Sequence, residues 1–103
     1  MSAVMVIHMD ISDEAWITPY FAAVPALLGE YGARPLAGSR NVRLLEGTGE
    51  APDRLAIIRF PSLDHVDRFM SDPRYQPFRA MREGGSTARI FVFNDESSDG
   101  ALA

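Results

Sequence analysis

Three short segments of the chain carry apolar side chains on both of the faces that a β-strand presents. They are residues 3–9 (AVMVIHM), 54–60 (RLAIIRF) and 87–93 (TARIFVF). Side chains alternate along a strand, so Val4 and Met5 point in opposite directions although both are apolar. Apolar runs of this length are typical of strands that are covered on both faces. The sheet that they form therefore needs a covering layer on each side.

A stripe of apolar residues after the first strand predicts a helix. Ser12 and Asp13 supply a cap and an acidic first turn, and Gly32 ends the segment. The stripe recurs every three or four residues, at Trp16, Tyr20, Val24, Leu27 and Tyr31. Pro19 and Pro25 interrupt it, so we expect a bent helix or a helix in two pieces.

The rest of the chain continues the succession of strands and helices. Residues 33–46 predict a strand with a bulge or bend at Gly38–Ser39, and a polar turn at 47–53 joins it to the strand 54–60 as a hairpin. Ser62 caps a second helix, which restarts at Asp72–Pro73 and stops at Gly84–Gly85. After the strand 87–93, residues 95–103 predict a flexible acidic tail.

The order strand, helix, strand, strand, helix, strand predicts the fold class. Right-handed crossovers place both helices on one face of a four-stranded antiparallel sheet, which is the ferredoxin-like βαββαβ arrangement of α+β proteins. We expect one such domain over residues 1–94. A bare apolar sheet face is unusual on a soluble monomer. The sequence therefore predicts that the chain is its own partner, in a homodimer that joins two sheet faces.

The composition excludes several kinds of function. The 103 residues contain no cysteine and no lysine, which removes disulfides, thiolate metal sites, thiol catalysis and Schiff-base chemistry. The net charge of -4 argues against binding nucleic acid. No apolar run reaches the roughly 20 residues of a membrane helix and no signal peptide is visible, so we expect no membrane partner and a cytoplasmic location. His8 and His65 lack the spacing of metal ligands, and we expect neither a metal nor another cofactor.

Several short motifs lie along residues 4–94. They are Tyr20, the segments 24–28 (VPALL), 31–34 (YGAR), 45–47 (LEG), 60–62 (FPS) and 71–76 (SDPRYQ), and Arg82. In this combination the chain resembles the domain of unknown function family 1330, within the dimeric α/β-barrel superfamily. Met70 departs from the pattern, because such sequences often carry an aromatic residue there. The resemblance implies a ferredoxin-like fold and back-to-back dimers, and it makes Arg34 and Arg82 candidate ligand-binding residues, but it implies no agreed reaction.

His8 and Tyr20 are the candidate catalytic residues. His8 lies near Asp10 at a strand end, where an imidazole beside a carboxylate can act as a general base. The alternative is a partly buried histidine with a structural hydrogen bond. Tyr20 could line a cavity with Tyr75 and Trp16 and orient a polar ligand, although core packing requires the same helical spacing.

Arg59 is the unusual residue of an apolar strand and the last candidate ligand-binding group. A charge at this position needs a carboxylate, a carbonyl or water. It could bind an anion in a pocket between sheet and helices, or it could pair across the sheet, for instance with Glu46.

Three functions are compatible with these residues. The first is a homodimer that binds a small aromatic or carboxylate ligand between sheet and helices. The second is a cofactor-independent enzyme of the monooxygenase or isomerase type, acting on a small aromatic or keto compound, with His8 as base and Arg59 as anion-binding group. Haem binding ranks last, because His8 occupies the strand where haem-degrading relatives carry asparagine. The fold alone does not decide between them.

Overall fold

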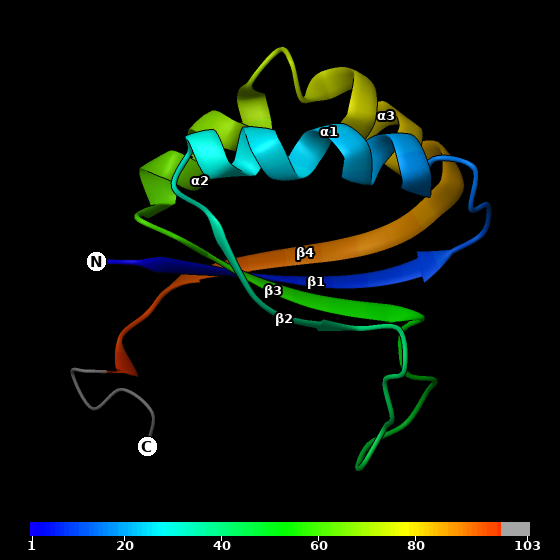
Figure 1. The fold of residues 1–103 in the computed structure, drawn as a ribbon. Helices are drawn as coiled ribbons and strands as arrows, with labels where there is room; N and C mark the ends of the chain where they lie inside the picture. Colours follow the sequence, from blue (N-terminus) through cyan, green and yellow to red (C-terminus); the bar gives the residue numbers. More distant parts are fainter. Residues whose placement is uncertain (98–103) are drawn as a thin grey trace.

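The computed structural model describes residues 1–97, which form a four-stranded antiparallel sheet covered by helices on one face (Figure 1). The elements are β1 (Ala3–Ile11), α1 (Ile17–Glu30), β2 (Arg34–Ser39), β3 (Arg54–Phe60), α2 (Leu63–Ser71), α3 (Gln76–Gly85) and β4 (Ser86–Asn94). The strand order is β2-β3-β1-β4. This confirms the predicted α+β, ferredoxin-like βαββαβ fold, with the second helix divided into α2 and α3.

The strand registers define which side chains share a face. On the face that the helices cover lie Met5, Ile7, Met9, Ala56, Ile58 and Ile90. The opposite face, called the outer face below, carries Val4, Val6, His8, Leu55, Ile57, Arg59, Arg89, Phe91 and Phe93. Within residues 1–97 no helix covers it, and Phe91 and Phe93 are 44% and 50% exposed. Both faces are therefore apolar, as the alternation predicted.

The core lies between the helices and the covered face. Phe60 is fully buried there, and Val24 and Phe69 are almost so. No helix among residues 1–97 is long and apolar enough to cross a bilayer.

The first helix begins later than predicted and is continuous. Ser12 and Asp13 are not helical; their N–H groups instead donate to the Gly85 carbonyl at 2.9 and 3.1 Å, which ties the end of β1 to the end of α3. The Asp13 carboxylate accepts a hydrogen bond from the Ala15 N–H at 2.9 Å. α1 then runs unbroken through Pro25, so the prediction of two pieces was wrong.

The predicted strand 33–46 ends at Ser39, and residues 40–53 form a long loop, called the arm below. Its apolar residues do not pair with another strand, and Leu45 is 80% exposed. The bulge lies between Pro35 and Ala37 rather than at Gly38–Ser39. At the base of the arm, Asp53 accepts from the Ile11 N–H at 2.8 Å, and its own N–H donates to Asp10 at 3.1 Å. In Figure 1 the arm projects away from the helices, on the side of the outer face.

The helix α3 ends at Gly84–Gly85, as predicted from the sequence. Both lie in the last turn of α3, and β4 begins at once with Ser86. A Cβ atom at Gly85 would lie 2.3 Å from Cδ1 of Trp16, so glycine is required there by a close approach of the indole ring.

The start of the predicted tail is attached to the domain. The Asp95 N–H donates to the Ser2 carbonyl at 2.8 Å. Residues 98–103, most of the predicted tail 95–103, lie outside the described residues.

Candidate functional site

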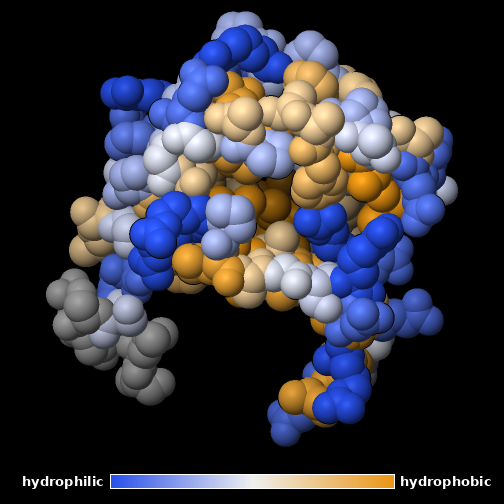
Figure 2. Space-filling view, in the orientation of Figure 1, coloured by the Kyte–Doolittle hydropathy of each residue, from blue (hydrophilic) through white to orange (hydrophobic). Residues whose placement is uncertain are grey.

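An apolar cavity of about 80 Å³ lies between α1, α3 and the covered face of the sheet. Figure 2 shows the corresponding hollow with an apolar floor between the helical layer and the sheet. The sheet contributes Met5, Ile7, Met9, Ala56, Ile58 and Ile90, and the polar groups in the wall are Trp16, Tyr20, Tyr75, Arg54 and Arg82. Apolar walls with a few converging polar groups are typical of small-molecule sites.

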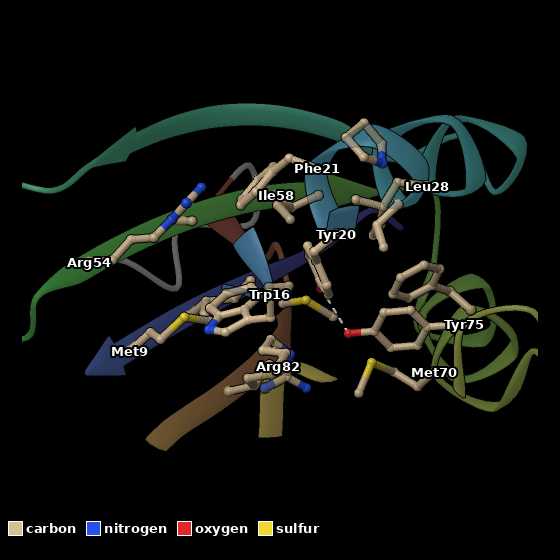
Figure 3. A pocket seen from close by; sticks show the side chains of 17 residues that line it. Met9, Trp16, Tyr20, Phe21, Leu28, Arg54, Ile58, Met70, Tyr75 and Arg82 are labelled. Atoms are coloured by element: carbon tan, nitrogen blue, oxygen red, sulfur yellow. Dashed lines mark hydrogen bonds between the residues drawn. The ribbon is translucent and has the colours of Figure 1, made fainter. Parts of the chain in front are cut away.

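Two tyrosines meet inside this cavity. The hydroxyl groups of Tyr20 on α1 and Tyr75 before α3 are 3.0 Å apart, and either can donate to the other (Figure 3). Trp16 packs edge-on against Tyr20 at 5.2 Å between ring centroids. Phe69 lies 4.3 Å from the Tyr75 ring. Tyr20 comes one helical turn after Trp16, which is why the two rings lie on the same side of α1.

Tyr20 is neutral at physiological pH. Burial raises the pKa of Tyr20 well above its ordinary value, and the neighbouring Tyr75 raises it further. The positive charge of Arg82 acts in the opposite direction and lowers this pKa. A protonated phenol donates a hydrogen bond, so the pair can orient a ligand but does not start as a strong base.

Arg82 is buried in the wall of the cavity. It is 5% exposed, and its Nε has no hydrogen-bond partner. It forms no salt bridge within residues 1–97. Burial of a cation without an anion lowers folding stability by several kcal/mol, so Arg82 destabilises the fold unless an anion pairs with it.

Arg54 and Phe21 form the more exposed part of the wall. The Arg54 guanidinium carbon lies 4.5 Å from the centroid of the Phe21 ring, and Phe21 is 40% exposed. Partial burial lowers the pKa of Arg54, with a further contribution from the charge of Arg40. This arginine can attract an anion toward the cavity from its open side.

A hydrogen-bonded turn positions Tyr75. Asp72 is 7% exposed and accepts from the Tyr31 hydroxyl at 2.7 Å and from Arg74 through its backbone and guanidinium. The hydrogen bonds from Arg74, then that from Tyr31, hold the pKa of Asp72 far below its usual range. Gln76 donates to the Met70 and Asp72 carbonyls at 2.9 and 3.1 Å. The segment 71–76 is thus a rigid connection between α2 and α3.

The structure places four of the seven candidate residues at the cavity and three on the other side of the sheet. Trp16, Tyr20, Tyr75 and Arg82 line the cavity. His8 lies on the outer face, where its ring packs edge-on against Phe91 at 5.7 Å. Arg34 and Arg59 are cross-strand partners, away from the cavity.

Arg59 has a different partner from the one suggested by the sequence. Its guanidinium donates to Asp95 at 2.9 Å and to the Ser2 hydroxyl at 2.5 Å, not to Glu46. Glu46 lies in the arm, which leaves the sheet. Arg59 therefore joins the two ends of the described chain.

Several cavity residues were not predicted from the sequence. The three methionines Met5, Met9 and Met70 have no polar group that would mark them, and only alternation along β1 indicated that Met5 and Met9 share a face. Among residues 1–97, no three histidine, aspartate or glutamate side chains gather in a way that could hold a metal ion.

Comparison with solved structures shows the fold in other proteins. A protein of unknown function from Rhodopseudomonas palustris is 14% identical, with a TM-score of 0.79 over 89% of this chain and 80% of that one. SnoaB, a cofactor-independent oxygenase from Streptomyces nogalater, is 16% identical, with a TM-score of 0.64 over 90% and 91%. A dimeric ferredoxin-like protein of unknown function from Jannaschia sp. CCS1 is 12% identical, with a TM-score of 0.70 over 91% and 99%.

Comparison with sequences shows the family. No functionally curated protein matches the chain. Residues 2–95 match the family described as Domain of unknown function (DUF1330), in agreement with the motifs noted above. Since this match covers nearly the whole sequence, the chain belongs to the DUF1330 family.

Proposed function

We propose that the protein is a homodimer that binds a small organic molecule in the cavity between its helices and its sheet. The observation that carries this proposal is the cavity itself, because close-packed cores leave few spaces of this size. Hydrophobic packing alone would not place a hydrogen-bonded tyrosine pair and a buried arginine without an ion pair in the wall of one cavity.

A cavity-filling variant tests this function. Ala56→Leu adds three carbon atoms to a side chain that lines the cavity, whereas Ala80→Leu adds the same atoms to an exposed position on α3. Binding of small neutral and anionic organic molecules is measured by shifts in the amide ¹H–¹⁵N spectrum. Ala56→Leu should abolish binding while Ala80→Leu retains it. Equal binding by both variants would show that the ligand binds elsewhere.

Catalysis without a cofactor is the second candidate function. It is favoured by the fold shared with SnoaB and by a tyrosine pair close to a cation in one cavity. The chemistry is then proposed at Tyr20, with Tyr75 and Trp16 orienting the substrate. His8 and Arg59 could serve a reaction only at the outer face. Loss of turnover in Tyr20→Phe with retained turnover in His8→Ala would support the cavity; the reverse result would move the site to the outer face.

The proposed dimer joins the outer faces of two copies. Phe91, Phe93 and Leu36 are 44%, 50% and 49% exposed there. Burying the exposed parts of the two phenylalanines, on the order of 200 Å² together, would contribute about 5 kcal/mol before the costs of association. The arm projects on the same side and would flank the second copy (Figure 1).

The mass in solution tests the dimer. A dimer has twice the 11.4 kDa of the chain. Light scattering should report this mass for the wild type and half of it for Phe91→Glu. Met81→Glu is the matched control, because Met81 is also exposed but lies on α3. A monomeric wild type, or a dimer that persists in Phe91→Glu and Phe93→Glu, would contradict the proposed interface.

A further inference from the structure

Five arginines form no ion pair within residues 1–97, and Arg82 is the buried one, whereas Arg34, Arg43, Arg54 and Arg89 are half-buried or exposed. Five other arginines form ion pairs within residues 1–97: Arg40, Arg59, Arg68, Arg74 and Arg79. The more buried Arg82 forms none, and its Nε–H has no acceptor. A guanidinium carries five N–H donors in a rigid planar group, a geometry that matches a carboxylate.

The position of Arg82 is held by its surroundings. The Ser86 hydroxyl donates to the Arg82 carbonyl at 2.6 Å. Three residues later the Gly85 carbonyl accepts from the Trp16 indole at 3.3 Å as well as from the end of β1. The last turn of α3 is thus attached to two other elements. The negative end of the helix dipole favours a cation there but does not satisfy its N–H groups.

The tyrosine pair offers a second donor at the same place. When one hydroxyl donates to the other across 3.0 Å, the accepting hydroxyl keeps its own hydrogen. Arg82 is close enough for its charge to act on Tyr20. Figure 3 shows the arginine and the pair on neighbouring sides of one space.

We propose, as a deepening of the proposed function, that the cavity is a receptor for a small monocarboxylate anion, which pairs with Arg82 and accepts the remaining phenolic hydrogen of the Tyr20–Tyr75 pair. The organic part of the anion lies against the apolar wall of Met5, Ile58 and Ile90. The ligand brings the counter-charge that Arg82 lacks.

The volume of the cavity limits the size of this anion. About 80 Å³ is available, whereas a cavity that holds benzene has about 150 Å³. If the volume per heavy atom is the same as for benzene, the cavity holds about three or four heavy atoms, which is the size of formate or acetate. An aromatic or larger keto acid enters only if flexible side chains such as Met9 and Met70 move aside.

Acetate and acetamide provide a matched pair of probes, because they have the same number of heavy atoms and differ in charge. Each is titrated into the full-length protein at constant ionic strength, and binding is followed by the Nε–H signal of Arg82 in the ¹H–¹⁵N spectrum. For so small a ligand we expect a Kd between about 0.1 and 10 mM for acetate. Acetamide should bind at least about ten-fold more weakly.

The variants are Arg82→Met, which removes the charge, and Arg79→Met, which removes a neighbouring charge on the same helix. Arg82→Met should weaken acetate binding by at least about ten-fold and leave acetamide within about two-fold. Arg79→Met should leave both unchanged. Arg82→Lys keeps the charge and should retain part of the preference for acetate.

Three outcomes would overturn the inference: equal binding of acetate and acetamide by the wild type, absence of acetate binding, or equal effects of Arg82→Met and Arg79→Met. Comparing acetate with acetamide in the wild type needs no variant, so this comparison tests the inference even if Arg82→Met does not fold. If neutral molecules bind and Ala56→Leu abolishes their binding, the proposed function stands while the monocarboxylate inference fails.

Discussion

Replacing Gly85 by alanine would place a methyl group 2.3 Å from Cδ1 and 2.7 Å from Nε1 of Trp16. It would also lie 3.0 Å from the Asp13 carbonyl, which belongs to the backbone and cannot easily move. The indole must shift, and its hydrogen bond to the Gly85 carbonyl at 3.3 Å is lost. Because Trp16 lines the cavity, the displaced ring would also change the cavity's shape.

The size of the effect follows from these contacts. Overpacking costs about 1–3 kcal/mol, and the lost hydrogen bond about 1 kcal/mol. Alanine recovers about 1 kcal/mol of helix propensity relative to glycine. The net loss of about 1–3 kcal/mol corresponds to a fall in melting temperature of roughly 5–20 °C for a domain of this size.

Gly84→Ala is the matched control for this experiment. Gly84 is the preceding residue in α3, and a Cβ atom there would meet nothing within 4 Å. Alanine should therefore raise the free energy of unfolding by up to about 1 kcal/mol. Both variants are melted at one protein concentration and followed by circular dichroism, because association changes the apparent stability. The reasoning is refuted if Gly85→Ala melts at or above the temperature of Gly84→Ala.

Three further predictions follow from the hydrogen bonds and pKa shifts. Tyr75→Phe should lower the free energy of unfolding by about 1–2 kcal/mol, because it leaves the Tyr20 hydroxyl without a partner. The double variant Tyr20→Phe/Tyr75→Phe should lose less stability than the sum of the two single losses. Strictly additive losses in urea titrations would count against a hydrogen bond between the two hydroxyls. The pKa of Tyr20 is raised above its ordinary value of 10.0, so the neutral form is favoured in the folded state and stability should fall as pH rises above that value. Absorbance at 295 nm should show a late-ionising phenol that is missing in Tyr20→Phe, and an unchanged titration curve would exclude the assignment. Hydrogen bonds from Ser97, with a further one from Arg59, lower the pKa of Asp95 from 3.8 to about 2, so their stabilisation is present above pH 3.8 and is lost as pH falls toward 2. Asp95→Asn should show a weaker loss of stability over that range in acid unfolding, and an identical acid transition would contradict this.

Much of the fold was predictable because its signals are local. The alternation along β1 and β3 and the helical spacing of Trp16 and Tyr20 predicted the elements and their apolar sides. The Ser62 cap is confirmed, since its side chain accepts from the His65 N–H at 3.2 Å. These signals act within a few residues, so no knowledge of distant contacts was needed.

The arm was predicted wrongly, and the tertiary contact made by the last glycine of α3 was missed, because distant residues decide both. Val42 and Leu44 have the apolar character of a strand, but β3 begins at Arg54 and leaves them without a hydrogen-bonded neighbour. Gly85 has the character of a helix stop, yet it is needed for contact with Trp16, 69 residues away.

The direction of His8 and Arg59 could not be read from alternation. On β1 both sets of side chains are apolar, Val4 and Val6 on one side, Met5 and Ile7 on the other. The pattern therefore groups His8 with Val4 and Val6, and Arg59 with Leu55 and Ile57, but it shows neither that the two groups share a face nor which face the helices cover. The register between β1 and β3 and the crossover of the chain over the sheet decide this.

The sequence by itself determined the order of the elements, the two apolar sides of the sheet and the Ser62 cap, because these depend on neighbouring residues and on alternation. Only the tertiary structure decided which side faces the helices, and hence that Tyr20, Tyr75 and Arg82 meet in one cavity while His8 and Arg59 lie outside it. Those three residues are up to 62 positions apart, from 20 to 82. They come together because α1, α3 and the covered face of the sheet pack around a common space.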